Sequence, residues 1–263
     1  MKAVYTMGLS IDLHGKVAVI TGATGQLGRV MARTLAAAGA DIAVHYARNA
    51  DMAAQLVEEI RALRDPDGTP RRAMAIQADI TREADVLRMA EEIRAALGDA
   101  DIVVNNAVIQ YDWQSILAQP LADFQPQFDS CVMQSVLTAR AFLPAMQAKR
   151  QGRFIGINTE CSILCNANSG AYAAAKAGMT GLYRVLAKEV GGDNITVNQI
   201  SPGWTVSDRD RANGTEVAPD YDEKIPLKRR GTDLEIAHAV VFLASNLASY
   251  ITGVNLPVCG GAV

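Results

Sequence analysis

Short apolar runs alternate with longer amphipathic stretches along the chain, and this alternation restricts the possible fold more than any other feature. The apolar runs stand at residues 16–21, 41–46, 73–79, 101–107, 153–159 and 195–203. Stretches typical of helices stand at 26–38, 51–64, 82–97, 122–150, 170–190 and 233–245. Because the apolar runs show little polar alternation, both of their faces are expected to be covered by helices. The pattern predicts an α/β fold with a doubly wound parallel sheet, formed by residues 1–263 as a single domain.

Composition and charge argue against several classes of partner. The formal net charge is only -3, with acids and bases interspersed, so no basic field exists for nucleic acid or for a membrane surface. No apolar run is long enough to span a membrane, and the first residues do not read as a secretory signal. We therefore expect a cytoplasmic protein with neither nucleic acid nor membrane as a partner.

Metal and disulfide chemistry are not expected either. The four cysteines are too scattered for a disulfide framework, and no second ligand pair at zinc spacing accompanies Cys161 and Cys165. The three histidines, His14, His45 and His238, lie far apart without a pattern of carboxylates around them. The sequence therefore predicts reduced thiols, no metal site and no histidine-based triad.

A glycine-rich turn joins the first apolar run to the first helical stretch, in "VAVITGATGQLGRVMARTLAAAGA". Gly22 permits a sharp exit from the strand, Gly25 lets the backbone approach a phosphate, and Gly28 allows close packing of the helix on the strand. The amides at the start of the helix attract negative charge. A plain tight turn between strand and helix is the alternative, but this context favours dinucleotide binding.

Polar or small residues stand at the ends of the other apolar runs, where the carboxyl ends of parallel strands form a ligand-binding edge. They are His45, Tyr46, Ala47 and Arg48; Asp79; Asn105, Asn106 and Ala107; Thr159; and Pro202 and Gly203. A purely structural role would not require them at every strand end. A site is therefore expected at this edge.

Tyr172 and Lys176 lie four positions apart in "GAYAAAKAG", an alanine-rich stretch that favours helix. At that spacing the phenol and the ammonium lie on one face, one turn apart, and can serve a common site. The pair alone leaves open whether this face is catalytic or an ordinary helix surface.

Taken together, these motifs resemble the short-chain dehydrogenase/reductase family from about Leu13 to Gly261, with "TGATGQLG", "NNA", "SPG" and "YITG" as further matches. The resemblance implies a Rossmann fold with a seven-stranded sheet and hydride transfer between a nicotinamide cofactor and a ketone or secondary alcohol. Within the family, oxoacyl-carrier-protein reductases look most similar. The implied cofactor-binding residues are Gly22, Thr24, Gly25, Gln26, Leu27, Gly28, Tyr46, Arg48, Asp79, Ile80, Asn105, Asn106, Ala107, Tyr172, Lys176, Pro202, Gly203, Trp204 and Thr205.

The resemblance also implies the catalytic roles. Tyr172 would donate a proton to the carbonyl during reduction and accept one during oxidation. Lys176, together with the oxidised nicotinamide ring, would supply the positive charge that lowers the phenol pKa, and it would hold the ribose hydroxyls. Thr159 stands where the family has a serine, and its hydroxyl can still orient the substrate oxygen.

Three departures from the family pattern leave other functions open. Cys131 stands in place of an asparagine of a proton relay, Val108 in place of a glycine beside the cofactor, and Cys259 in place of an aspartate near the C-terminus. A catalytically impaired dinucleotide-binding sensor or scaffold is one alternative, and a structural subunit without cofactor is another.

The end of the second apolar run predicts the choice of cofactor. Tyr46, Arg48 and Asn49 stand there, and no carboxylate occurs before Asp51. An acidic residue would favour NAD(H), whereas an arginine can form charge-assisted hydrogen bonds to a 2′-phosphate. We therefore expect NADP(H) to be preferred over NAD(H), although Arg48 could also be a solvated loop charge.

Two further expectations concern a loop and the assembly. Residues 204–231 read as an irregular segment, long enough to be a mobile substrate loop or lid. The alanine-rich faces of the 122–150 and 170–190 helices permit close approach of a second copy, so a homo-oligomer, a dimer or a tetramer, is expected. The substrate is expected to be a small molecule with a carbonyl or alcohol group.

Overall fold

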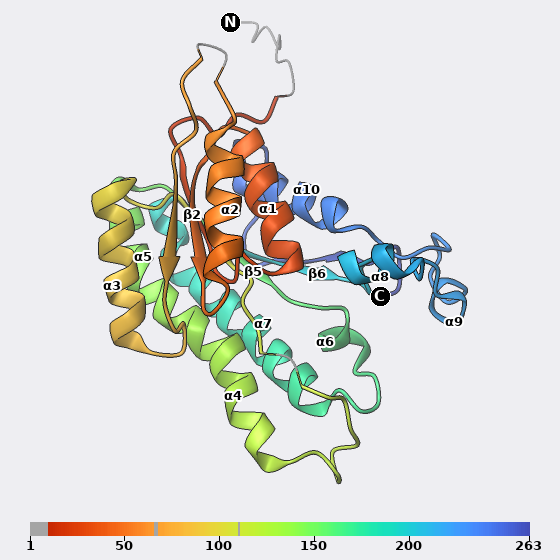
Figure 1. The fold of residues 1–263 in the computed structure, drawn as a ribbon. Helices are drawn as coiled ribbons and strands as arrows, with labels where there is room; N and C mark the ends of the chain where they lie inside the picture. Colours follow the sequence, from red (N-terminus) through yellow and green to blue (C-terminus); the bar gives the residue numbers. More distant parts are fainter. Residues whose placement is uncertain (1–9, 66–67, 110) are drawn as a thin grey trace, which may run out of the picture.

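All the expected strands join one parallel sheet in the computed structural model, which describes residues 10–65, 68–109 and 111–263 (Figure 1). Within these residues the sheet has seven strands in the order β3-β2-β1-β4-β5-β6-β7. Their bounds are β1 Val17–Ile20, β2 Asp41–Tyr46, β3 Ala73–Gln77, β4 Ile102–Asn105, β5 Gly152–Ile157, β6 Ile195–Pro202 and β7 Asn255–Val258. The doubly wound sheet is confirmed. The apolar pattern missed β7, whereas the family resemblance implied a seventh strand.

Helices cover both faces of the sheet. Figure 1 shows α1, α2 and α10 together, with α3, α5 and α7 forming the other layer. Two buried clusters correspond to these layers, one with Met31 of α1 and Val240 of α10, the other with Met89 of α3 and Tyr183 of α7. The helix bounds are α1 Gln26–Ala37, α2 Ala50–Arg61, α3 Glu83–Ala96, α4 Phe124–Phe128, α5 Gln134–Lys149, α6 Cys161–Leu164, α7 Gly170–Val190, α8 Asp208–Asn213, α9 Pro219–Asp222 and α10 Asp233–Ala244.

Several strands end before the apolar runs that predicted them. β3 ends at Gln77, β4 at Asn105 and β5 at Ile157. Asp79, Asn106 and Thr159 therefore lie just beyond the sheet, in the loops at its carboxyl edge. Ligands bind at this edge in sheets of this type.

The helical stretch predicted over 122–150 is confirmed, because residues 121–149 form consecutive helical turns, but they do not form one regular α-helix. A π-helical turn at Asp129–Met133 separates α4 from α5. The Ser135 hydroxyl donates to the Cys131 carbonyl at 2.9 Å, and such a bond competes with the regular helical ladder. Cys131 is fully buried in this turn. Hydrophobic periodicity contains no signal for such a turn.

Segment 204–231 is also more regular than its sequence predicts. It contains α8 and α9, and Ser207 begins α8 with a capping box in which Asp210 is the reciprocal partner. A β-bridge pairs Thr205 with Gly231, which brings the two ends of the segment together.

Nowhere in the described part of the chain does a helix have the length and apolar character needed to cross a membrane.

Candidate active site

The candidate site lies at the carboxyl ends of the central strands. Strand order runs outward in opposite directions from β1 and β4, so a crevice is expected where these two strands end. β5 and β6 continue the same edge, because β5 pairs with β4 and β6 pairs with β5. The residues after these four strands therefore meet at one edge.

The glycine turn after β1 requires glycine at two positions. Gly22 has a φ of +63°, and a Cβ there would lie 2.9 Å from the Ala107 Cα. A Cβ at Gly28 would lie 2.4 Å from the Gly22 carbonyl oxygen. Gly25 is the N-cap of α1 and provides no side-chain cap, so first-turn amides of α1 are left for an outside acceptor. This cradle fits the pyrophosphate of a dinucleotide.

Thr21 ties the glycine turn to the loop after β4. Its hydroxyl oxygen accepts the amides of Asn106 at 2.9 Å and Ala107 at 3.0 Å. The Asn106 side chain donates to the carbonyls of Thr21 at 3.0 Å and Gly22 at 3.1 Å. Asn106 thus holds the turn in place from the neighbouring strand. Sequence reasoning missed Thr21, although it directly precedes the first glycine.

His45 supports the same turn from β2, a role that sequence reasoning also missed. The Gly22 amide donates to its Nδ1 at 2.9 Å, and its Nε2 lies 3.0 Å from the Ala78 carbonyl. The ring therefore carries its proton on Nε2 and is neutral. Burial lowers its pKa from the ordinary 6.5, while nearby Asp79 opposes that shift. The signal in the sequence is a histidine inside an otherwise apolar strand.

Acid should destabilise the protein through His45. The folded state lowers the pKa of this imidazole. Below about pH 6.5 the imidazole is therefore protonated in the unfolded chain but remains neutral in the folded protein. The free energy of unfolding should fall by up to about 1.4 kcal/mol per pH unit from this group. Urea unfolding at pH 7.5 to 5.5 should show a shallower slope for His45→Asn than for the wild type. The exposed His238→Asn should keep the wild-type slope; equal slopes for all three proteins would contradict this role.

The tyrosine–lysine pair lies beside the loop after β5. Lys176 is 3% exposed, and its Nζ donates to the Ile157 carbonyl at 2.6 Å. Nζ lies 5.9 Å from the centroid of the Tyr172 ring. The Thr159 side chain lies close enough to the Tyr172 phenol to lower the pKa of that phenol. The structure thus brings together the three residues for which the sequence predicted catalytic roles.

The pKa of the phenol differs from the expectation. Burial raises the pKa of Tyr172 above its ordinary value, the thiols of Cys131 and Cys161 raise it further, and the nearby Thr159 side chain opposes these effects. Burial also lowers the pKa of Lys176 from its ordinary value, because an ammonium is less stable away from water. In this state Tyr172 keeps its proton at neutral pH, as a proton donor must.

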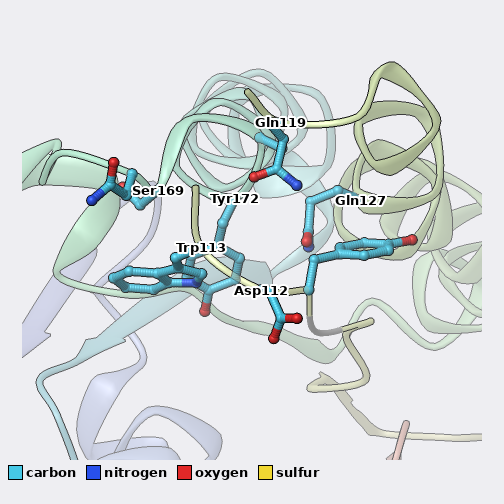
Figure 2. Close-up of a pocket in the computed structure, with 9 residues that line it drawn as sticks. Asp112, Trp113, Gln119, Gln127, Ser169 and Tyr172 are labelled. Atoms are coloured by element: carbon cyan, nitrogen blue, oxygen red, sulfur yellow. The ribbon is translucent and has the colours of Figure 1, made fainter. Parts of the chain in front are cut away.

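A pocket of about 250 Å³ opens next to Tyr172 (Figure 2). The Trp113 ring packs against the Tyr172 ring with centroids 6.1 Å apart. The lining residues are Tyr111, Asp112, Trp113, Gln119, Gln127, Asn168, Ser169, Ala171 and Tyr172. No lysine or arginine is among them. The pocket therefore offers an aromatic wall, neutral hydrogen-bonding groups and one acidic side chain, that of Asp112, beside the phenol.

Other residues expected to bind the cofactor have different surroundings. The buried Asn105 amide donates to Tyr183 at 2.9 Å and accepts from Thr138 at 2.9 Å, so its side chain faces the helices. The Gln26 amide donates to the Val206 carbonyl at 2.7 Å. Leu27 packs against the core and Ile80 is buried, so both can offer a ligand their backbone more readily than their side chains.

The end of β2 and the loop after β3 remain open to a ligand. Arg48 is exposed and makes no hydrogen bond or ion pair with any residue that the structure describes. Asp79 is exposed, and its carboxylate accepts from the Thr81 amide and hydroxyl, which lowers its pKa. Tyr46 and Thr24 are partly exposed.

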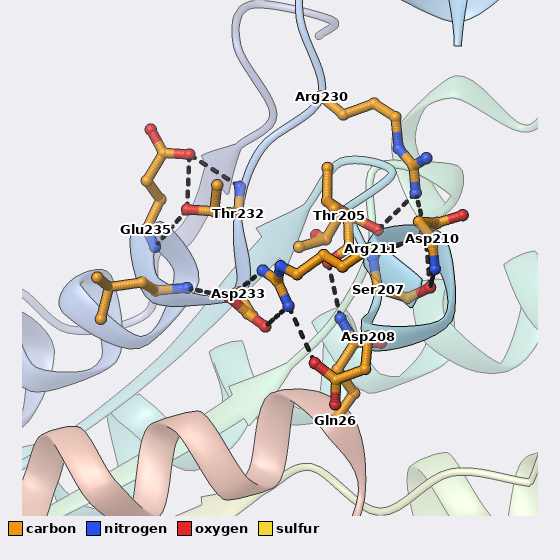
Figure 3. Close-up of polar contacts among 12 residues, drawn as sticks. Gln26, Thr205, Ser207, Asp208, Asp210, Arg211, Arg230, Thr232, Asp233 and Glu235 are labelled. Carbon is orange, nitrogen blue, oxygen red and sulfur yellow. Dashed lines mark hydrogen bonds and ion pairs between the residues drawn. The ribbon is translucent and has the colours of Figure 1, made fainter. Parts of the chain in front are cut away.

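Segment 204–231 is attached to α1 and α10 by polar contacts (Figure 3). Arg211 forms two hydrogen bonds of 2.8 Å with Asp233, which is the first residue of α10. Buried Arg230 pairs with Asp210 at 2.6 Å and donates to the Thr205 carbonyl at 2.9 Å. These contacts place Trp204 and Thr205, which follow β6, at the edge of the site. In the described residues, no cluster of three or more potential ligands could hold a metal ion.

A parallel sheet in this order, with a glycine cradle and a tyrosine–lysine pair at one edge, defines the class of NAD(P)-dependent oxidoreductases with a Rossmann fold. Within this class, the chain belongs to the short-chain dehydrogenase/reductase family, which acts on alcohol and carbonyl groups. The matching family model is described as enoyl-(acyl carrier protein) reductase and covers residues 22–263.

Two curated relatives are named 3-oxoacyl-(acyl-carrier-protein) reductase FabG. The protein from Staphylococcus epidermidis is 35% identical over 246 residues, 94% of this chain and 98% of the relative. The protein from Escherichia coli is 34% identical over 251 residues, 95% of this chain and 98% of the relative. The resemblance read from the sequence is confirmed.

Two solved structures are similar over their whole length. A blue fluorescent protein from a metagenomic library, in complex with NADPH, is 33% identical with a TM-score of 0.85 and covers 96% of this chain and 99% of its own. A 7α-hydroxysteroid dehydrogenase, complexed with NADH and 7-oxo glycochenodeoxycholic acid, is 33% identical with a TM-score of 0.86 and covers 98% of both chains.

Proposed function

We propose that this protein transfers a hydride between a nicotinamide cofactor and a ketone or secondary alcohol, with Tyr172 as general acid and base. The observation that supports the proposal is the position of Tyr172, which borders the pocket, has Thr159 near its phenol and has the Lys176 Nζ 5.9 Å from the centroid of its ring. A general acid must lie next to the reacting oxygen and keep its proton at the working pH. Tyr172 meets both conditions.

Each of the three residues has a distinct part in this reaction. Tyr172 donates its proton to the carbonyl oxygen during reduction and accepts it back during oxidation. The Thr159 hydroxyl orients the same oxygen, and Lys176 holds the ribose and adds positive charge near the phenol. The nicotinamide, when bound, supplies or accepts the hydride. The glycine cradle, Asp79 and the end of β6 bind the rest of the dinucleotide.

Thr159 should tolerate loss of its methyl group but not of its hydroxyl. Thr159→Ser keeps the hydroxyl beside Tyr172, so kcat/KM should stay within about threefold of the wild type. Thr159→Val keeps the shape and removes the hydroxyl, which should lower kcat/KM at least about tenfold. Steady-state kinetics with one ketone at saturating cofactor compares the two variants. Equal activity of the valine and serine variants would show that the hydroxyl has no role.

NADP(H) should be preferred over NAD(H), because the exposed guanidinium of Arg48 lies just beyond the end of β2 and would be available to bind a 2′-phosphate. Arg48→Ala should weaken NADPH binding about 10-fold to 100-fold, the loss expected for a charge-assisted hydrogen bond, and leave NADH binding nearly unchanged. Tyr46→Asp should reverse the preference by repelling the phosphate. Fluorescence titration with both reduced cofactors measures these constants, with Arg88→Ala on α3 as the control. A wild-type dissociation constant for NADH at or below that for NADPH would defeat this prediction.

A substrate panel tests the proposed function. Purified protein is incubated with NADPH or NADH and a series of small ketones, hydroxylated ketones and 3-oxoacyl thioesters, and cofactor oxidation is followed by absorbance. Turnover of at least one ketone, lost in Tyr172→Phe, is the expected result. A protein that binds NADPH but turns over none of them would instead be a dinucleotide-binding sensor or scaffold. Cys131, buried in the π-helical turn, is the departure that would favour that outcome.

The remaining parts of the proposal concern organisation. The chain acts as one cofactor-binding and catalytic unit, and segment 204–231 covers the substrate. The protein forms a homo-oligomer through α4, α5 and α7 and works in the cytoplasm. Light scattering at micromolar concentration tests the assembly, and a monomeric mass would exclude it.

A further inference from the structure

Glu160 is a buried carboxyl group to which the proposed reaction assigns no role. It follows Thr159 directly in the loop after β5 and is only 4% exposed. Its side chain contacts no lysine, arginine or histidine in the described part of the chain; both carboxylate oxygens instead lie 3.0 Å from the hydroxyl of Tyr221 in α9. Burial raises the pKa of Glu160, and the bond from Tyr221 opposes that rise. A buried acid paired with a phenol needs a functional explanation.

The direction of these hydrogen bonds is determined by the donors. The Trp204 amide donates to the Tyr221 hydroxyl oxygen at 2.9 Å. The phenol therefore directs its own proton to the Glu160 carboxylate, which can only accept when ionised. Burial and the nearby carboxylate raise the pKa of Tyr221, so the phenol keeps this proton. Glu160, Tyr221 and Trp204 form one connected chain of hydrogen bonds from the catalytic loop to segment 204–231.

The space around this chain of bonds is closely filled. A Cβ at Gly203 would lie 2.7 Å from the Tyr221 hydroxyl and 3.0 Å from a Glu160 oxygen, so only glycine leaves room for the pair. The Trp204 ring packs edge-on against Tyr221 with centroids 5.5 Å apart. The Arg230 guanidinium lies 4.2 Å from the centroid of the same indole. Trp204 is thus held from two sides where β6 ends.

We propose that Glu160 is a positioning residue that clasps segment 204–231 to the catalytic loop through Tyr221, and thereby sets the position of Trp204 at the carboxyl edge of the sheet, where β6 ends. The other polar anchors of the segment described above lead to α1 and α10, away from Thr159. In the described residues, the Tyr221–Glu160 pair is the side-chain hydrogen bond that joins the segment to the loop after β5. The position of segment 204–231 and the position of Thr159 are therefore linked.

A double-mutant cycle tests the clasp. Tyr221→Phe removes one hydroxyl and keeps the ring against Trp204, while Glu160→Met keeps the length of the side chain and removes the carboxylate that accepts the hydroxyl proton. Each change should raise KM for the ketone about tenfold with kcat within about threefold, because the clasp is made equally in ground and transition states. The KM of the double variant should be close to that of each single variant, rather than raised by both factors multiplied together. Tyr250→Phe, at a fully exposed tyrosine, is the matched control and should behave as the wild type.

Limited proteolysis provides a readout that does not need turnover. Trypsin should cut after the exposed Lys224 of segment 204–231 several-fold faster in Tyr221→Phe than in the wild type or Tyr250→Phe. The kinetic part of the inference rests on the proposed function, but the proteolysis does not. Faster cutting in a protein without activity would support the clasp while the proposed function failed. Wild-type cutting rates in Tyr221→Phe, or KM effects that simply multiply in the double variant, would overturn the clasp.

Discussion

Replacing Tyr172 with phenylalanine should lower kcat by about 10² to 10⁴, the contribution expected from a positioned general acid. The change removes only the hydroxyl and leaves the ring against Trp113, so the pocket should keep its shape. The dissociation constant for NADPH should stay within about twofold, since the cradle of α1 is untouched. Single-turnover kinetics and fluorescence titration on the same preparation measure the two quantities.

The control for this substitution is Tyr250→Phe, which removes the hydroxyl of a fully exposed tyrosine. It should leave both kcat and cofactor binding at wild-type values. If Tyr172→Phe kept full activity, Tyr172 and Lys176 would be ordinary residues of α7, and the proposed mechanism would be wrong.

Replacing Lys176 with methionine should damage two properties together. The substitution keeps the length of the side chain but removes the buried ammonium near the phenol, so kcat/KM should fall about 10² to 10³, as for other buried electrostatic groups in active sites. Cofactor affinity should fall about tenfold, because the same ammonium would bind the ribose hydroxyls. The Ile157 carbonyl also loses its donor, so a lower melting temperature is expected.

Lys188→Met, at an exposed position on the same helix, controls for loss of charge from α7. It should leave turnover, cofactor affinity and stability unchanged. A Lys176→Met protein that bound NADPH as tightly as the wild type would show that the lysine does not touch the cofactor.

Site residues that belong to a short sequence motif could be predicted from the sequence. The glycine turn follows from a strand, a required sharp exit and a helix start, and all three are visible within "VAVITGATGQLG". Tyr172 and Lys176 share a helix face because their spacing is one turn. The parallel sheet follows from apolar runs without polar alternation.

Residues that act through distant partners could not be predicted in this way. His45 meets Gly22 only because β2 pairs with β1, and Glu160 meets Tyr221 only because the chain brings α9 next to the loop after β5. The π-helical turn around Cys131 depends on hydroxyls of the following turn that capture backbone carbonyls. Such contacts depend on tertiary packing, which apolar periodicity does not encode.

The most direct test of hydride transfer follows a labelled hydrogen. NADPH carrying deuterium at both C4 positions of the nicotinamide ring is incubated with the protein and a ketone substrate from the panel, and the alcohol is analysed by mass spectrometry. The account predicts one deuterium on the carbinol carbon of the product in the wild type, and labelled product formed about 10² to 10⁴ times more slowly by Tyr172→Phe. An alcohol formed without the label, or labelled product formed equally fast by both proteins, would contradict it.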